Sequence, residues 1–227
     1  KSAQVVFNSL PFVVFFAVVV IAYWTMRSWP ARKNLLVVAS YIFYGAWNPP
    51  FAALLYGTTA MDFYLGRIMG KQERPEARKV WLVVSVAVNL SMLGFFKYGN
   101  FLLENCQWAL ARGGIAYHPP HLDLFLPIGI SFYTFEAISY VADGYSGKFA
   151  ARARWRDFNY FIVFFPKLTA GPIIRPHSFF PHIDKPYSIT ENKFETYLQM
   201  IFVGLFQKVV LADTMAPCLP LAGAACE

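Results

Sequence analysis

Long runs of apolar residues, separated by short charged stretches, make up most of the sequence. A membrane-spanning helix needs ~20 mostly apolar residues, and several of these runs reach or approach that length. The run at 158–170 is shorter, so we expect a re-entrant or partly submerged segment there. The pattern predicts an all-α, polytopic transmembrane helical bundle with short and broken helices. Its expected helical segments are about residues 10–26, 34–47, 51–66, 80–103, 125–142, 158–170 and 194–216.

Prolines and glycines indicate where the apolar runs break. Residues 34–61 contain no charged side chain, but Asn48-Pro49-Pro50 interrupts them, and proline cannot continue a helix. The sequence therefore predicts two helices folded back as a hairpin. Paired glycines and prolines between 104 and 124 predict a connecting loop. We expect a polar interlude at 171–193.

Basic residues are concentrated in alternate connections between the predicted helices. The stretches 27–33, 67–79 and 143–157 hold 3, 5 and 4 Lys or Arg residues, whereas the intervening connections hold Arg112 alone. Because cytoplasmic loops carry an excess of Lys and Arg, these three stretches are expected inside. The N-terminus is then expected on the periplasmic side.

The composition excludes an ordinary soluble domain. The chain is 57% apolar and 15% charged, against about 45–50% and about 25% in soluble proteins. The net charge of +7 falls in short clusters rather than in one basic stripe, which argues against nucleic-acid binding. Neither the three cysteines nor the four histidines have metal-ligand spacing, so no metal site is expected. His118, His121, His177 and His182 are interpreted as plain loop histidines.

Ionisable residues inside apolar segments are informative, because each costs about 2.5–3.5 kcal/mol if it faces lipid. Asp62 and Lys97 lie near predicted helix ends, where snorkelling or pairing at the interface explains them. The segment 125–142 is different, since steps of about 100° per residue bring a polar stripe into one sector. This stripe predicts either a hydrogen-bonded contact between helices or a substrate path. It consists of Tyr133, Glu136, Tyr140 and Asp143.

Helix breakers inside the apolar stretch at 164–176 predict a second polar feature. Broken backbone at membrane depth is tolerated only where protein or a water-filled cavity satisfies it. Lys167 and Arg175 flank Gly171 and Pro172 and could meet an anionic or carbonyl-bearing ligand, unless they anchor an interfacial kink. Further along, Lys208 is expected to be a buried cation on the last helix, beside Gly204.

Several blocks of the chain resemble the membrane-bound O-acyltransferases. They are residues 33–44, 96–101, 126–143, 165–175 and 207–213, of which LPIGISFYTFE and AGPIIRP are the most specific. The resemblance covers nearly the whole chain in the same order as the N-terminal half of that family. It is closest to the branch containing the alginate O-acetylation and teichoic acid D-alanyl transfer proteins. Residues 1–227 are therefore expected to be the N-terminal part of one such membrane domain, truncated at its C-terminus.

The resemblance implies a bacterial inner-membrane enzyme that moves an acyl group, expected to be acetyl, from a cytoplasmic thioester across the membrane. The donor would be acetyl-CoA or an acyl-carrier thioester, with no tightly bound cofactor. The acceptor would be a hydroxyl of alginate or another exopolysaccharide, reached directly or through a periplasmic acyltransferase partner and other polysaccharide-modification subunits.

The resemblance also bears on individual residues. The family's histidine base lies on a later helix and is expected beyond Glu227, so no catalytic residue is assigned here. The candidates for the acyl path or donor binding are Tyr133, Glu136, Tyr140, Asp143, Lys167, Gly171, Pro172, Arg175 and Lys208. A non-catalytic transporter or scaffold subunit of a polysaccharide export or modification complex is the alternative, since broken helices and buried charges also occur in transporters.

Overall fold

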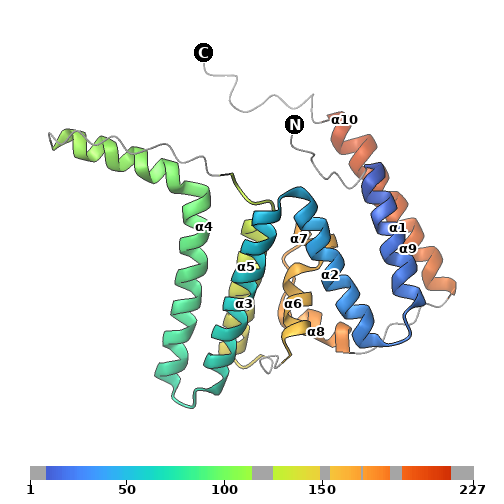
Figure 1. Ribbon diagram of the computed structural model, residues 1–227, viewed down its shortest axis with the longest axis horizontal. Helices are drawn as coiled ribbons and strands as arrows, with labels where there is room; N and C mark the ends of the chain where they lie inside the picture. The colour runs from blue at the N-terminus through green and yellow to red at the C-terminus, as the bar shows by residue number, and fades with distance from the viewer. Residues whose placement is uncertain (1–8, 114–124, 149–153, 170, 185–190, 216–227) are drawn as a thin grey trace. The chain divides into compact units, whose positions relative to one another are not determined.

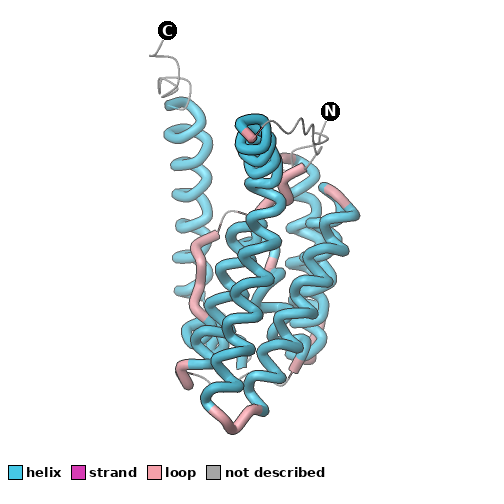
Figure 2. Tube along the Cα trace, turned by 90° about the vertical axis from the view of Figure 1, so that its left-hand side faces the viewer, coloured by secondary structure: helices cyan, strands magenta, loops and turns pink. Residues whose placement is uncertain are grey.

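The computed structural model describes residues 9–113, 125–148, 154–169, 171–184 and 191–215. Every regular element in these ranges is a helix, and no strand occurs among them, as Figure 2 shows, which confirms the all-α prediction. The elements are α1 (Leu10–Thr25), α2 (Trp29–Trp47), α3 (Pro49–Lys71), α4 (Pro75–Arg112), α5 (Ile130–Tyr145), α6 (Trp155–Val163), α7 (Phe165–Leu168), α8 (Pro176–Asp184), α9 (Glu191–Phe206), η1 (Gln207–Ala212) and α10 (Asp213–Met215).

The chain divides into two compact units, of which the larger lies within residues 15–185. The smaller unit lies within residues 6–14 and 186–227 and contains α9, η1 and α10. These three elements follow one another without a break, and η1 is a π-helical stretch. All side chains described between 193 and 215 are exposed.

The predicted break between the second and third segments is present at Asn48. This residue has extended backbone angles, ends α2 and precedes α3. Pro49 and Pro50 occupy the first positions of α3, where a helix does not use the backbone N–H that proline lacks. Helices α2 and α3 pack against each other, so the predicted hairpin forms.

Helix α4 extends further than the sequence predicted. It runs for 38 residues and ends at Arg112, so the prediction of a loop from 104 is wrong for residues 104–112. The glycines and prolines behind that prediction begin only at 113, and 104–112 contains no helix breaker. Figure 1 shows α4 turning sharply before its C-terminal end. The polar interlude is also partly helical, because α8 lies inside it.

The segment from α6 to α8 enters and leaves the larger unit at the same end. Trp29 Nε1 donates to the carbonyl of Ile183 at 2.9 Å, and Lys33 Nζ bonds Asp157 at 2.6 Å, so the end of α8 and the start of α6 both lie beside the start of α2. Leu168, at the end of α7, instead contacts Gly129, just before α5. The segment is therefore re-entrant, as Figure 1 also shows for α6, α7 and α8.

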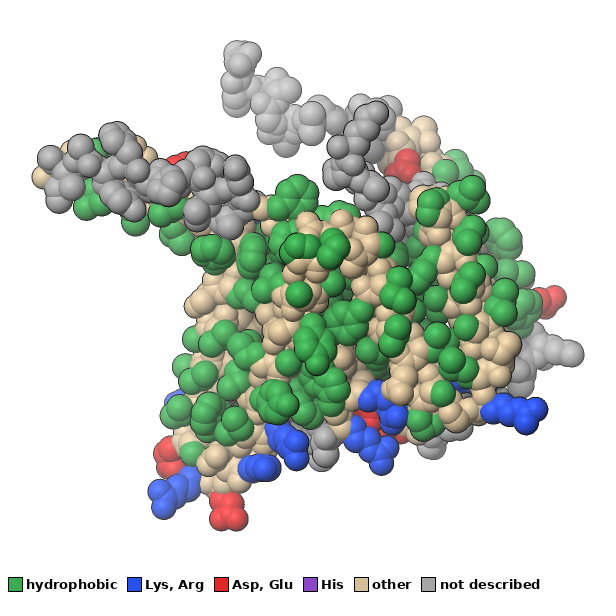
Figure 3. All heavy atoms as spheres, viewed as in Figure 1, with side chains coloured by type: hydrophobic (Ala, Val, Ile, Leu, Met, Phe, Trp, Pro, Cys, Tyr) green, Lys and Arg blue, Asp and Glu red, His purple; other side chains and the backbone are tan. Residues whose placement is uncertain are grey.

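The three basic stretches meet at this same end. Arg78, at the start of α4, donates to the carbonyls of Gly144 and Tyr145 at the end of α5, both at 3.2 Å. The Lys33–Asp157 bond joins the first stretch to the third. Figure 3 shows Lys and Arg side chains along the lower edge, below a broad apolar surface. Such a surface suits a lipid environment.

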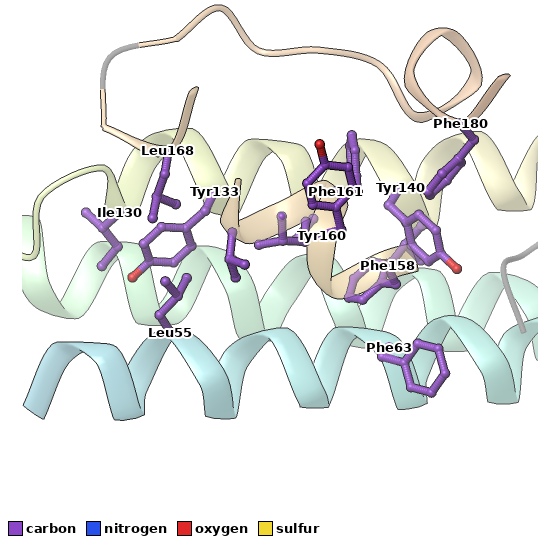
Figure 4. Close-up of a cluster of buried hydrophobic side chains, with 14 of the residues drawn as sticks. Leu55, Phe63, Ile130, Tyr133, Tyr140, Phe158, Tyr160, Phe161, Leu168 and Phe180 are labelled. Carbon is purple, nitrogen blue, oxygen red and sulfur yellow. The ribbon is translucent and has the colours of Figure 1, made fainter. Parts of the chain in front are cut away.

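Two described helices, Pro75–Arg112 and Lys193–Met215, are long and apolar enough to cross a membrane, and α1 is a shorter apolar helix. The total number of spans stays a prediction. The core of the larger unit combines aromatic and aliphatic side chains and lies between α3, α5 and α6 (Figure 4). Gly66 of α3 allows close contact there, since a Cβ on it would lie 2.9 Å from Cε1 of Tyr140.

Candidate functional site

The polar stripe of α5 is buried. Tyr133, Glu136, Tyr140 and Asp143 all face the interior, as the helical periodicity predicted. Figure 4 shows Tyr133 and Tyr140 within the buried hydrophobic cluster, Tyr133 next to Leu168 and Tyr140 next to Phe158. The stripe thus runs along the face of α5 that packs on the re-entrant segment.

Glu136 and Lys167 form a buried ion pair at the centre of this face. Lys167 Nζ lies 2.5 Å from Glu136 Oε2, and the two side chains are only 6% and 5% exposed. The backbone N–H of Ile174 donates to Oε1 at 3.4 Å. The carboxylate of Glu136 therefore binds both limbs of the re-entrant segment, before and after its break. The ammonium of Lys167 also lies 4.4 Å from the ring centre of Phe161, a cation–π distance.

Two glycines allow the re-entrant segment to come this close. Gly129 has φ +77°, and a Cβ there would lie 2.4 Å from the carbonyl oxygen of Leu168. A Cβ on Gly171 would lie 2.5 Å from Cα of Lys167, whose carbonyl accepts the Gly171 N–H at 2.9 Å. Larger residues at either position would displace the backbone that carries Lys167. Ser40 adds a further tie, since its Oγ accepts the N–H of Phe165 at 3.0 Å.

Asp143 binds two cationic side chains and a histidine at the basic end of α5. Its carboxylate is 2% exposed and lies 3.4 Å from Lys148 Nζ, 3.3 Å from Arg175 Nη1 and 3.0 Å from His177 Nδ1. Burial alone raises the pKa of Asp143, but the hydrogen bond from His177 and the charges of Lys148 and Arg175 outweigh burial, so this pKa lies below its usual value. Lys148, Arg175 and His177 leave about half of each side chain in solvent, where they could bind an anion.

The interpretation of His177 as a plain loop histidine is wrong, since it lies on α8 and contacts a buried carboxylate. No local pattern signals this contact, because 34 residues separate the partners. His182 lies on α8 too, so its interpretation as a loop histidine is also wrong, and its Nδ1 is 2.8 Å from the carbonyl of Ser178. His118 and His121 lie outside the described residues.

Asp62 and Lys97 also differ from expectation. Asp62 does not snorkel: it is buried, and its Oδ1 accepts from Asn89 Nδ2 at 2.6 Å and Ser85 Oγ at 3.2 Å. Ser85 and Asn89 are four residues apart on α4, so they face α3 together. Lys97 is exposed but lies well inside α4, because that helix continues to Arg112.

Two candidates remain, Pro172 and Lys208. Pro172 is exposed beside Gly171. Lys208 belongs to the smaller unit, bonds Asp213 and has 58% of its side chain exposed, so the expectation of a buried cation is wrong. Among the described residues, no group of three or more His, Cys, Asp or Glu could hold a metal ion.

The catalytic histidine implied by the family resemblance is expected beyond Glu227. Glu227 itself, with residues 216–226 before it, lies outside the described residues. The position of that histidine therefore stays a prediction. The described part of the chain contributes His177 and His182, and neither is matched to the family base.

Comparison with known proteins identifies relatives of one functional type. The chain is 36% identical to the alginate O-acetylase AlgI of Pseudomonas aeruginosa over 213 residues, which are 93% of this chain and 40% of that protein. It is 29% identical to the peptidoglycan O-acetyltransferase of Helicobacter pylori over 214 residues, covering 81% of this chain and 39% of the relative. The teichoic acid D-alanyltransferase of Bacillus subtilis matches at 30% over 106 residues, 46% of this chain and 27% of the relative.

The chain is homologous to these O-acyltransferases. This confirms the resemblance inferred from the sequence blocks. The chain spans about 40% of the length of the alginate O-acetylases that it matches. No family model and no solved structure matches it. Together with the apolar helices, the homology to these O-acyltransferases identifies a membrane protein.

Proposed function

We propose that the whole protein transfers an acetyl group from a cytoplasmic thioester to a hydroxyl of a polysaccharide outside the inner membrane. The thioester C–S bond breaks, a C–O bond to the hydroxyl forms, and the hydroxyl proton passes to the departing thiolate. The observation that carries this proposal is the buried Glu136–Lys167 pair at the re-entrant break, in a chain homologous to O-acetyltransferases. Such transfer needs a general base, which we place on a part of the protein beyond Glu227.

The basic end of the larger unit is proposed to face the cytoplasm, because Lys and Arg accumulate there. The donor's phosphates would approach Arg175 and Lys148, since charge-assisted hydrogen bonds to phosphate are strong. From that end, the buried face of α5 leads from Asp143 to Glu136 and Tyr133. We propose that this face lines the acyl path, and that the acyl group reaches the polysaccharide hydroxyl directly or through a periplasmic acyltransferase partner and other polysaccharide-modification subunits. The N-terminus is then periplasmic.

The test replaces Glu136 in the full-length protein. Glu136→Gln keeps the shape of the side chain but removes its charge opposite Lys167, so we expect polymer O-acetylation to fall at least tenfold. Mass spectrometry of the surface polysaccharide measures this, with protein level checked by immunoblot. Glu104→Gln is the matched control, because Glu104 is exposed on α4. Normal acetylation in Glu136→Gln cells at normal protein level would contradict the role of this pair.

A non-catalytic transporter or scaffold is the second candidate. The re-entrant segment favours it, since broken helices with buried charges form binding sites in transporters. Deleting the gene separates the two: an acetyltransferase leaves polymer exported but unacetylated, whereas an exporter leaves polymer inside the cell.

A further inference from the structure

An apolar groove lies between α1 and the re-entrant segment of the larger unit. It has a volume of about 240 Å³, and its walls include Phe16, Val20 and Tyr23 of α1, Leu36 of α2 and Phe164 between α6 and α7. None of its lining residues is charged. The groove is open along one side, so a molecule from the surroundings can enter it.

Helix α1 is tied to the larger unit on both sides of this groove. At one end, the ring of Phe15 lies 5.4 Å from the ring of Phe165. At the other end, the guanidinium of Arg32 lies 4.8 Å from the ring centre of Tyr23, and Arg32 Nε donates to the carbonyl of Met26 at 2.9 Å. The groove is therefore a gap between two fixed contacts.

The length and position of the groove suit part of a lipid acyl chain. Phe16 and Tyr23 are seven residues apart on α1, which is about 10 Å along a helix. One leaflet of the hydrocarbon core is about 15 Å thick. Tyr23 and Trp24 lie just before the basic stretch 27–33, where aromatic residues are common at a membrane interface. A chain from the leaflet at the basic end can therefore lie along the groove.

Arg32 supplies a cation at the end of the groove where the headgroup of such a lipid would lie. It precedes Leu36 by one turn on the same face of α2, and its guanidinium stacks on Tyr23, so two lining residues place it there. Within the described ranges, its two Nη groups have no hydrogen-bond partner, and the side chain is partly exposed. Paired guanidinium N–H groups match the geometry of phosphate oxygens.

We propose that this groove binds an anionic phospholipid from the leaflet at the basic end. One acyl chain lies along the groove, and the headgroup phosphate pairs with Arg32. Phosphatidylglycerol is favoured over phosphatidylethanolamine, because Arg32 repels the ammonium of the latter. The bound lipid completes the packing of α1 on the larger unit. This inference goes beyond the proposed acyl transfer and does not depend on it.

The test reconstitutes the full-length protein in vesicles of equal phosphatidylglycerol and phosphatidylethanolamine, extracts it in mild detergent and measures the retained lipids by mass spectrometry. The natural protein retains phosphatidylglycerol at least about fivefold over phosphatidylethanolamine, the preference that one cation confers. Arg32→Gln abolishes this preference. Arg74→Gln is the matched control, since it removes an exposed arginine at the start of α4, and it keeps the preference.

A second pair of variants tests the groove and serves alone if Arg32→Gln does not accumulate. Val20→Phe fills the groove, so retained phosphatidylglycerol falls to the level of phosphatidylethanolamine. Val18→Phe adds the same ring at a position of α1 that is 59% exposed and outside the lining, and retention stays unchanged.

Three results would overturn the lipid site, and none of them involves acetyl transfer. The first is equal retention of the two lipids by the natural protein. The second is an equal loss of preference in Arg74→Gln and Arg32→Gln, which would show a general effect of surface charge. The third is an unchanged preference in an accumulating Val20→Phe protein, which would show that no lipid chain occupies the groove.

Discussion

At the scale of single residues, the geometry of the Glu136–Lys167 pair is compatible with two different roles. It could fasten the re-entrant segment to α5, or it could supply charge and hydrogen bonds to a passing acyl group. Both charges are almost fully enclosed. Removing one partner of such a pair leaves an unpaired buried charge and costs about 3–5 kcal/mol, whereas replacing both by apolar residues is often neutral. This asymmetry allows the two roles to be separated.

We predict that Lys167→Met alone lowers the free energy of unfolding by about 3–5 kcal/mol, and that adding Glu136→Leu recovers most of it. If the pair acts in the acyl path, the recovered double variant still transfers no acetyl. Thermal unfolding in detergent and polymer acetylation measure the two properties on the same protein. A stable double variant with normal acetylation would show that the pair only fastens the helices.

At the scale of elements, the turn before α5 depends on a glycine. Gly129 and Gly147 both have positive φ, +77° and +70°, but only Gly129 faces an obstacle. A Cβ on Gly129 would lie 2.4 Å from the Leu168 carbonyl oxygen, while one on Gly147 would meet nothing within 4 Å. A substitution at either glycine therefore carries the same backbone penalty of about 1–2 kcal/mol for positive φ, whereas only a substitution at Gly129 carries a steric penalty as well.

We predict that Gly129→Ala destabilises the protein by about 1–3 kcal/mol more than Gly147→Ala, because the added methyl must push α7 away. The difference between their unfolding midpoints in detergent measures this steric penalty directly. Acetylation should fall in Gly129→Ala, since Lys167 lies on the displaced segment. Equal midpoints for the two variants would show that α7 yields without cost.

Local chemistry predicts some elements and not others. The break at Asn48-Pro49-Pro50 and the polar face of α5 follow from proline geometry and helical periodicity, and both are present. The partners of that polar face cannot be predicted from local sequence. Lys167 lies 31 residues from Glu136, and His177 lies 34 residues from Asp143. These residues meet only because the re-entrant segment folds back against α5. The last residue of α4 cannot be predicted in this way either. The glycines and prolines after 112 indicate a loop, but they do not indicate the residue at which the preceding helix ends.

At the scale of the whole molecule, the two ends of α4 give a test of orientation. Lys71 lies just before α4, among the basic stretches proposed to be cytoplasmic, while Cys106 is an exposed free cysteine near the opposite end of the helix. Replacing Cys218 and Cys226 by serine leaves Cys106 as the single thiol of these 227 residues for labelling.

We predict that a membrane-impermeant maleimide added to spheroplasts labels Cys106 in this background. A Lys71→Cys variant that also carries Cys106→Ser should react only after the membrane is permeabilised, because its thiol faces the cytoplasm. Labelling of Lys71→Cys in intact spheroplasts, with Cys106 protected, would invert the proposed topology. That result would place the Asp143 cations outside, where no cytoplasmic thioester could reach them, so acyl transfer from that end of α5 would be excluded together with the orientation.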